Sequence, residues 1–517
     1  MSTTTTSVQA DPIATHVTGQ TFRMLIDGEL VEAQKGARAV TWNPNTGSEL
    51  TEVPEAGPED VQRAVDAAHR AAPGWESAGL RQRTRCFAKF AELVREHREE
   101  LAMLDAIDCG NPVDRMRLDI DLSQSYLEGW PALAAAATGK VIPASADGLH
   151  YTASRPYGVV GRITAFNHPA MFAISRPLPS LITGNTLVMK CAPQTPLSAL
   201  RLAELFAEAF PPGVVNVLSG GAEVGDALVT HPQVKRLAFT GSKETGLVIQ
   251  RRAAESGCVK HVTLELGGKN AMVVFPDSDI DAAVEGAIFG MNFNVCQGQS
   301  CGSNSRVLVH SSIHDAFLDC VSARLAAYRV GPAYDEANDM GPVVSREHLK
   351  RVNGYIESGV RDGAVLRAGG GRPQGAPTGG FYVEPVVFGE VRPDMAIARE
   401  EIFGPVISVL AFDGYEEMLD IANGVDLGLT ASVWTHDLDL AHRTAARLDA
   451  GYVWINDSSK HFFGTPFGGT KNSGIGREES AEELDSYLES KVVHTRLAQG
   501  GDAFDRVLDT AGRRNPT

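Results

Sequence analysis

The chain has 517 residues, of which 64 are acidic and 47 basic, and its formal net charge is −17. A chain of this length is expected to form roughly two to four domains with large buried cores, and the acidic balance disfavours nucleic acid and anionic membrane surfaces as partners. Its seven cysteines are odd in number and scattered, which is unlike a disulfide framework and indicates a reducing, cytoplasmic location.

The first twenty residues, MSTTTTSVQADPIATHVTGQ, are polar and predict a disordered N-terminus. They lack the basic and apolar regions of a secretory signal. No uninterrupted apolar run approaches the ~18 residues that a membrane-spanning helix needs. The sequence therefore predicts a protein without a membrane partner.

Apolar residues recur at helical spacing over residues 58–72 and again over 81–108, which predicts two surface helices. From residue 158 the pattern changes. The short apolar runs GVVGRITAF, TLVMK, VVNVL, RLAFTG and HVTLEL then alternate with amphipathic segments. Such alternation is typical of a parallel sheet covered by helices.

The same alternation restarts after Gly267 and Gly268. The runs NAMVVF and RVLVH are each followed by a predicted helix, over 280–293 and 314–328. This indicates a second α/β unit. The glycine- and proline-rich segment at 368–380 is expected to be a surface loop, and the end of the chain a tail with one helix around 504–511.

Cys296 and Cys301 lie five residues apart in the stretch CQGQSCG, and the residues alone leave three interpretations open. A zinc site would need a second Cys or His pair at matching spacing, and none lies nearby, so no metal is expected. An inert buried thiol is the ordinary alternative. The third is one working thiol with a neighbour.

Other motifs favour the working thiol. They are FNHP at 166–169, GNTLVMK at 184–190, FTGSKETG at 239–246, LELGGKN at 264–270, EEIFGPV at 400–406 and PFGGTKNSGIGRE at 466–478. Together with CQGQSCG, and in this order, they resemble the NAD(P)-dependent aldehyde dehydrogenase superfamily from about residue 22 to about residue 495. Each motif is weak by itself, but seven in order are highly specific.

The resemblance implies an α/β fold of two doubly wound domains and a small β bridging element. The implied parts are a cofactor-binding domain over 21–138 and 158–266, a catalytic domain over 267–466, an oligomerisation element from 139–157 and 487–497, and a tail over 498–517. Because the bridging element completes a neighbour's sheet in this family, a homodimer or homotetramer is expected.

The resemblance also implies the catalytic residues. Cys301, in the family's G-Q-x-C element, is the expected nucleophile, since a thiolate is accessible near neutral pH and adds readily to an aldehyde carbon. The amide of Asn167 and the backbone N–H of Cys301 would hold the oxyanion. Glu265 matches the general base that activates water for thioester hydrolysis, and Glu478 is a candidate proton relay. The ordinary alternatives are a turn role for Asn167 and an ion pair for Glu265.

The cofactor site is expected where a strand turns into a helix, because free N–H groups at a helix N-terminus attract pyrophosphate. The glycine pattern there is not the usual G-x-G-x-x-G. By resemblance, Lys190 reaches the adenosine ribose, and Glu401 and Phe403 hold the nicotinamide ribose and ring. The expected cofactor residues are Lys190, Pro193, Gly241, Ser242, Gly246, Glu401 and Phe403.

Pro193 departs from the family pattern. Many NAD-preferring members carry a glutamate at this position, whose carboxylate repels a 2′-phosphate. No arginine stands in the same stretch to bind that phosphate. NAD is therefore the expected cofactor, with NADP possible.

The substrate is expected to be a small aldehyde. By resemblance, the tunnel residues are Phe172, Ser175, Val295, Ser300, His461, Phe462 and Phe467. The small Ser175 and Val295 suggest a roomy tunnel for an aromatic or medium-length aldehyde, and Lys460 or His461 at its mouth would favour an acidic substituent. Two alternatives stay open: release of the acyl group to coenzyme A, and a catalytically silent member of the family.

Overall fold

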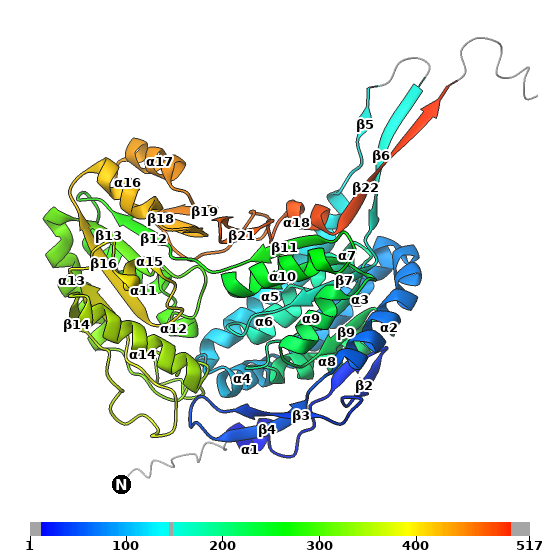
Figure 1. The fold of residues 1–517 in the computed structure, drawn as a ribbon, viewed down its shortest axis with the longest axis horizontal. Helices are drawn as coiled ribbons and strands as arrows, with labels where there is room; N and C mark the ends of the chain where they lie inside the picture. The colour runs from blue at the N-terminus through cyan, green and yellow to red at the C-terminus, as the bar shows by residue number, and fades with distance from the viewer. Residues whose placement is uncertain (1–11, 144–147, 498–517) are drawn as a thin grey trace, which may run out of the picture.

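The computed structural model describes residues 12–143 and 148–497, and Figure 1 shows two α/β bodies with a narrow β arm projecting from one of them. The predicted tail over 498–517, with its helix around 504–511, lies outside the described residues. Disorder is predicted for residues 1–20, but within the described part Pro12–His16 forms α1 and Val17 is buried. That part of the prediction is wrong because Val17 packs into a core cluster.

After α1, four short strands and four helices precede the parallel strands of the first sheet, and the first two of these short strands extend the edge of that sheet. The strands are β1 (Met24–Ile26), β2 (Glu29–Val31), β3 (Arg38–Trp42) and β4 (Glu49–Pro54). The helices are α2 (Pro58–Ser77), α3 (Gly79–Glu96), α4 (Arg98–Asp108) and α5 (Val113–Ala136). The single helix predicted over 81–108 is wrong, because the chain leaves helical geometry at His97. Apolar spacing continues across this break because α3 and α4 pack into the same core.

The first sheet has the strand order β2-β1-β9-β8-β7-β10-β11-β21, and β7 to β11 are parallel to one another, whereas β1 and β21 are antiparallel to β9 and β11. The strands are β7 (Val159–Ile163), β8 (Thr186–Lys190), β9 (Val215–Leu218), β10 (Val234–Thr240), β11 (His261–Glu265) and β21 (Gly474–Ile475). The helices between them are α6 (Pro169–Ser175), α7 (Leu178–Ile182), α8 (Leu197–Ala209), α9 (Ala222–Thr230) and α10 (Lys243–Glu255). The predicted alternation of strands and helices is confirmed.

The second sheet has the order β14-β15-β16-β13-β12-β18-β19 and is parallel except for β14. The strands are β12 (Ala271–Val274), β13 (Arg306–His310), β14 (Val365–Ala368), β15 (Val386–Gly389), β16 (Val406–Phe412), β18 (Thr430–Trp434) and β19 (Tyr452–Ile455). The helices are α11 (Ile280–Gly290), α12 (Phe293–Cys296), α13 (Ser311–Ala326), α14 (Arg346–Arg361), α15 (Ala396–Arg399), α16 (Tyr415–Asn423) and α17 (Leu438–Arg447). The predicted second α/β unit is confirmed, as is the loop that follows β14.

The arm is a three-stranded sheet in which β6 lies between β22 and β5. Its strands are β5 (Val141–Ile142), β6 (Gly148–Pro156) and β22 (Leu488–Arg496). The remaining elements are β17 (Leu427–Gly428), β20 (Thr470–Lys471) and α18 (Ala481–Ser486). Among the described residues, no helix is long and apolar enough to cross a membrane.

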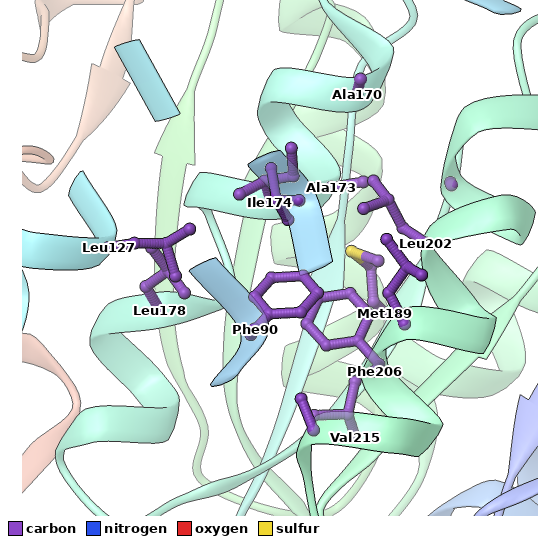
Figure 2. Packing of buried hydrophobic residues seen from close by; sticks show 14 of the residues in the cluster. Phe90, Leu127, Ala170, Ala173, Ile174, Leu178, Met189, Leu202, Phe206 and Val215 are labelled. Carbon is purple, nitrogen blue, oxygen red and sulfur yellow. The ribbon is translucent and has the colours of Figure 1, made fainter. Parts of the chain in front are cut away.

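The core that supports the first sheet fixes α6, the helix beside the candidate site. Figure 2 shows Phe90 of α3 against Phe206 of α8, whose rings stack with centroids 4.2 Å apart. Ile174 of α6 and Met189 of β8 belong to the same buried cluster. Because the core is close-packed and hardly compressible, α6 cannot move relative to β8 without disturbing this packing.

Candidate active site

A cavity of about 1070 Å³ lies at the carboxyl ends of the parallel strands of the first sheet. This is where ligands bind in open α/β sheets. Residues from both α/β units line it, and those of the second unit come from loops, helices and β17 rather than from its seven-stranded sheet, including Arg399, Glu400, Glu401 and Phe403 before β16. The predicted site residues on its wall are Asn167, Lys190, Pro193, Gly241, Ser242, Glu265, Cys301, Glu401 and Phe403.

Cys301 follows a tight turn after α12. Gln297 and Gly298 both have positive φ, 54° and 70°, and a Cβ at Gly298 would lie 2.5 Å from the carbonyl oxygen of Gly404. The carbonyl of Cys301 accepts a hydrogen bond from Nδ2 of Asn270 at 2.7 Å. The glycine and the asparagine thus hold the Cys301 backbone at the cavity wall.

The Cys301 thiol is neutral in the resting site. Burial raises the pKa of Cys301 above its usual range, and the neighbouring carboxyl groups of Glu265 and Glu401 raise it further, whereas Arg176 opposes them. A base must therefore remove the thiol proton before Cys301 can act as a nucleophile.

Glu265 ends β11 and is buried. Neither of its carboxyl oxygens has a hydrogen-bond partner among the described residues. Burial and the nearby Glu478 raise the pKa of Glu265 well above its usual range, against the opposing charges of Arg176 and Arg162. Glu265 is therefore not engaged in an ion pair, and its oxygens are available to a ligand or to water.

Glu478 has the opposite environment. Its carboxylate accepts a hydrogen bond from Nη2 of Arg162 at 2.8 Å and forms an ion pair with Nη1 of Arg176 at 3.0 Å. Although burial acts against it, these guanidinium groups hold the pKa of Glu478 below its usual range. Two carboxyl groups whose pKa values are pushed apart are suited to opposite acid and base roles.

Asn167 lies in the turn between β7 and α6. Its carbonyl accepts a hydrogen bond from Nδ2 of Asn111 at 2.8 Å. The preceding carbonyl, of Phe166, accepts from Sγ of Cys109 and Oγ1 of Thr195, each at 3.3 Å. The α4–α5 junction thus positions the turn that carries Asn167.

Sequence reasoning missed the side chains that support this turn. Oδ2 of Asp105 accepts a hydrogen bond from the N–H of Ala170 in α6 at 3.0 Å. His168 pairs through Nδ1 with Oδ2 of Asp119 at 2.6 Å, and Asp119 raises the pKa of His168 although burial acts against it. The only sequence signal was an acidic residue within an otherwise apolar helical stretch.

The helix N-terminus at the cavity suits a pyrophosphate. Ser242 caps α10, and its Oγ accepts a hydrogen bond from the N–H of Thr245 at 3.2 Å. A Cβ at Gly241 would lie 2.4 Å from the ring of Phe239, so only glycine fits beside the helix start. Gly246 does not line the cavity. It is buried in α10, where a Cβ would lie 2.7 Å from Leu266.

Three further groups suit a dinucleotide. Lys190 donates from Nζ to the carbonyl of Cys191 at 3.1 Å, and burial lowers its pKa. Oε1 of Glu401 accepts from the N–H of Gly268 at 2.8 Å, and burial raises the pKa of Glu401 to about 7. Phe403 has φ of 60°, and its carbonyl accepts from Nε2 of His348 at 2.6 Å. The cavity, the glycines and the capped helix fit NAD or NADP.

The predicted substrate residues do not line this cavity. Phe172, Ser175 and Phe467 are buried, Val295, Ser300 and His461 are partly exposed, and Phe462 is exposed. His461 pairs with Glu479 at 3.0 Å, and Lys460 pairs with Asp457 at 3.1 Å. Both side chains expected to favour an acidic substituent thus already contact a carboxylate, and the acidic substituent stays a prediction.

Comparisons with known proteins agree with this geometry. The model of the aldehyde dehydrogenase family matches residues 30–493. The chain therefore belongs to the aldehyde dehydrogenase family, an enzyme family of oxidoreductases, and the resemblance inferred from the motifs is confirmed.

Similar proteins cover almost the whole chain. The chain is 43% identical over 502 residues to the aldehyde dehydrogenase tropH of Talaromyces stipitatus, which covers 96% of this chain and 97% of that protein. It is 40% identical over 493 residues to the betaine aldehyde dehydrogenase of Rhizobium etli, with 95% and 99% covered. The structure of an aldehyde dehydrogenase from Bacillus cereus in complex with NAD+ matches with a TM-score of 0.91 and 40% identity over 95% of this chain and all of that chain.

Proposed function

We propose that this enzyme oxidises an aldehyde to its carboxylic acid with NAD+, through a thiohemiacetal and a thioester on Cys301. The observation that supports this most directly is the convergence of Cys301, Asn167 and Glu265 on one cavity that also suits a dinucleotide. The NAD+ complex of the Bacillus cereus relative supports NAD as the cofactor. NADP use stays an alternative, because Pro193 carries no charge to repel a 2′-phosphate.

In the first half of the reaction, the Cys301 thiol gives its proton to water in the cavity, the resulting thiolate adds to the aldehyde carbon, and the carbonyl oxygen becomes an oxyanion. The amide of Asn167 and the N–H of Cys301 stabilise that oxyanion, and losing one such donor typically costs about 3 kcal/mol. Bound NAD+ supplies the hydride acceptor. Loss of hydride from the thiohemiacetal carbon leaves a thioester on Cys301.

In the second half, water attacks the thioester, and Cys301 leaves as a thiolate while the carboxylic acid forms. Glu265 takes the proton of the attacking water, for which its two oxygens are unengaged. Glu478 is the proposed proton relay, but Arg162 and Arg176 keep it a carboxylate of low pKa, so it can carry a proton from Glu265 only transiently on the way to solvent. Each turnover thus consumes one aldehyde, one water and one NAD+.

Two alternatives are less well supported. Release of the acyl group to coenzyme A would not require the unengaged carboxyl group of Glu265. A catalytically silent protein would not require Cys301, Asn167 and Glu265 to converge. Carboxylate formation without coenzyme A separates the proposal from both alternatives.

The variant Glu265→Gln tests the role of the base. We expect the first turnover to release NADH in a burst of about one equivalent per active site, followed by steady turnover at least tenfold slower, because acylation precedes the step that needs the base. Rapid-mixing absorbance of NADH measures both phases, with Glu482→Gln on the surface of α18 as the matched control. Unchanged steady turnover in Glu265→Gln would remove Glu265 from the mechanism.

A panel of aldehydes can identify the preferred substrate. We propose an aromatic or medium-length aldehyde, and betaine aldehyde belongs in the panel because of the name of the Rhizobium relative. Values of kcat/KM for aliphatic, aromatic and amino aldehydes, measured with NAD+ and NADP+, would rank the candidates. A maximum for short aliphatic aldehydes would contradict the roomy tunnel inferred from Ser175 and Val295.

We further propose that residues 21–138 and 158–266 bind the cofactor, that 267–466 form the catalytic domain, and that the arm joins copies of the chain into a homodimer or homotetramer. Exposed apolar side chains on the arm, including Val141 (72% exposed) and Val492 (61%), support a partner there. Light scattering after size exclusion measures the assembly, and a monomer at micromolar concentration would contradict this proposal.

A further inference from the structure

Glu479 is a buried carboxylate for which the mechanism above has no role. It directly follows Glu478, its side chain is 2% exposed, and its backbone has φ of 67°. Its Oε1 accepts a hydrogen bond from Nη2 of Arg176 at 3.2 Å, and its Oε2 accepts one from Nδ1 of His461 at 3.0 Å. Glu479 therefore joins the end of α6 to the segment that follows β19.

Backbone contacts reinforce this junction. The N–H of Glu479 donates to Oε2 of Glu483 at 2.7 Å, and the carbonyl of Glu479 accepts from the N–H of Gly464 at 2.7 Å. The ring of His461 packs against Phe467, with centroids 4.5 Å apart. One residue thus holds the segment 461–467 through both its side chain and its backbone.

The held segment leads directly to Glu265. Phe467 and Glu478 exchange two backbone hydrogen bonds, at 3.0 and 2.7 Å. At the next residue, Gly468, a Cβ would lie 2.8 Å from Oε1 of Glu265. A displacement of the segment would therefore change the space in which Glu265 meets water.

The same groups also interact electrostatically. Arg176 forms an ion pair with Glu478 through Nη1 and donates a hydrogen bond from Nη2 to Glu479, so one guanidinium group neutralises part of the charge of two carboxylates. Although burial acts against it, His461 and Arg176 hold the pKa of Glu479 at about 2. Glu479 is therefore charged throughout the working range, and its charge raises the pKa of Glu478.

We propose that Glu479 is a positioning residue for thioester hydrolysis: it holds the segment beside Glu265 through His461, and it divides the charge of Arg176 between two carboxylates. The proposal rests on the role proposed above for Glu265. Without the negative charge of Glu479, less of the positive charge of Arg176 would be neutralised, and Arg176 would stabilise the anionic forms of Glu478 and Glu265 more strongly.

The sign of the expected effect follows from the surrounding charges. The groups that face Glu265 are Glu478, Arg176, Arg162 and Arg477, and those that face Glu479 are His461, Arg176, Tyr126 and Glu483. Replacing Glu479 with a neutral side chain makes the electrostatic potential around Glu265 more positive. A more positive potential favours the carboxylate and so lowers the pKa of Glu265. The basic form of Glu265 would then persist to lower pH.

The test is the pH dependence of the steady phase after the NADH burst in Glu479→Gln. We expect its acid limb to move to lower pH by about one unit, the lower end of what a neighbouring charge produces, and the burst amplitude to remain. The matched control is Glu482→Gln, an exposed carboxylate on α18, whose profile should match that of the parent enzyme.

A second variant separates charge from position. His461→Gln removes the ring that holds the segment but retains the charge of Glu479, so we expect slower hydrolysis by about threefold or more without a downward shift of the limb. An unmoved acid limb in Glu479→Gln, or an unchanged hydrolysis rate in His461→Gln, would overturn the proposal. If Glu265→Gln itself hydrolysed the thioester at the parental rate, the proposed function would fail instead, so the two failures are distinguishable.

Discussion

Asp105 beneath α6 makes stability depend on pH in a direction opposite to that of most carboxylates. Burial raises the pKa of Asp105 from 3.8 to about 7, although the neighbouring Ser198 hydroxyl and the hydrogen bond from the N–H of Ala170 oppose the shift. The protonated form is thus favoured in the folded state. Stability from this group is fully present below the unfolded-state pKa and is lost as pH rises through the folded-state pKa.

Asp105→Asn removes this titration and retains the shape of the side chain. Its amide oxygen can accept from the N–H of Ala170, and its NH₂ can donate to Oγ of Ser198, which has no hydrogen-bond partner among the described residues. With the two pKa values above, the parent loses about 2 kcal/mol more than the variant between about pH 5.5 and about pH 8.

Thermal unfolding at both pH values, at equal protein concentration, measures this difference. For a chain of this size unfolding as one unit, about 2 kcal/mol corresponds to a gain of about 2 °C for Asp105→Asn relative to the parent as pH rises. The exposed Asp114→Asn in α5 is the matched control and should show no such trend. A variant whose Tm difference from the parent is the same at both pH values would refute the reasoning.

Two further predictions concern the cofactor and the second cysteine. Pro193→Glu places a negative charge on the cavity wall and should lower kcat/KM with NADP+ by at least tenfold more than with NAD+, whereas equal losses would mean that residue 193 lies away from the 2′-position. Cys296→Ser should convert peroxide inactivation that dithiothreitol reverses into irreversible inactivation, provided that Cys296 and Cys301 lie within about 4.4–6.8 Å between Cα atoms and form a disulfide. Mass spectrometry that finds sulfinic acid on Cys301 beside a free Cys296 thiol in the peroxide-treated parent would contradict this.

Local sequence predicted the parts of the molecule that depend on local chemistry. The sequence shows the strands from β7 to β13 as short apolar runs because helices cover both faces of a parallel sheet, so side chains on both sides of each strand face apolar surroundings. The motif residues Asn167, Glu265 and Cys301 follow strands or turns, and the fold brings these strand ends to one cavity. Residue type and order sufficed for this part of the site.

The remaining features depend on contacts between residues far apart in the chain. Arg176 and Glu479 are 303 positions apart, and nothing near either residue indicates that they meet. The break at His97 was missed because the apolar spacing continues through it. The burial of Asp105 depends on where α6 packs, which the sequence around Asp105 does not indicate.

The central claim is that Cys301 carries the covalent step, and Cys301→Ala tests it most directly. The measurement is NADH formation from a good aldehyde substrate, together with NAD+ affinity by calorimetry and with Cys296→Ala as the matched control. We expect a loss of activity of at least a hundredfold in Cys301→Ala with NAD+ affinity within about threefold of the parent, because the thiol forms the thiohemiacetal and contributes little to dinucleotide binding. Retention of more than a few per cent of the parental activity in Cys301→Ala would contradict it.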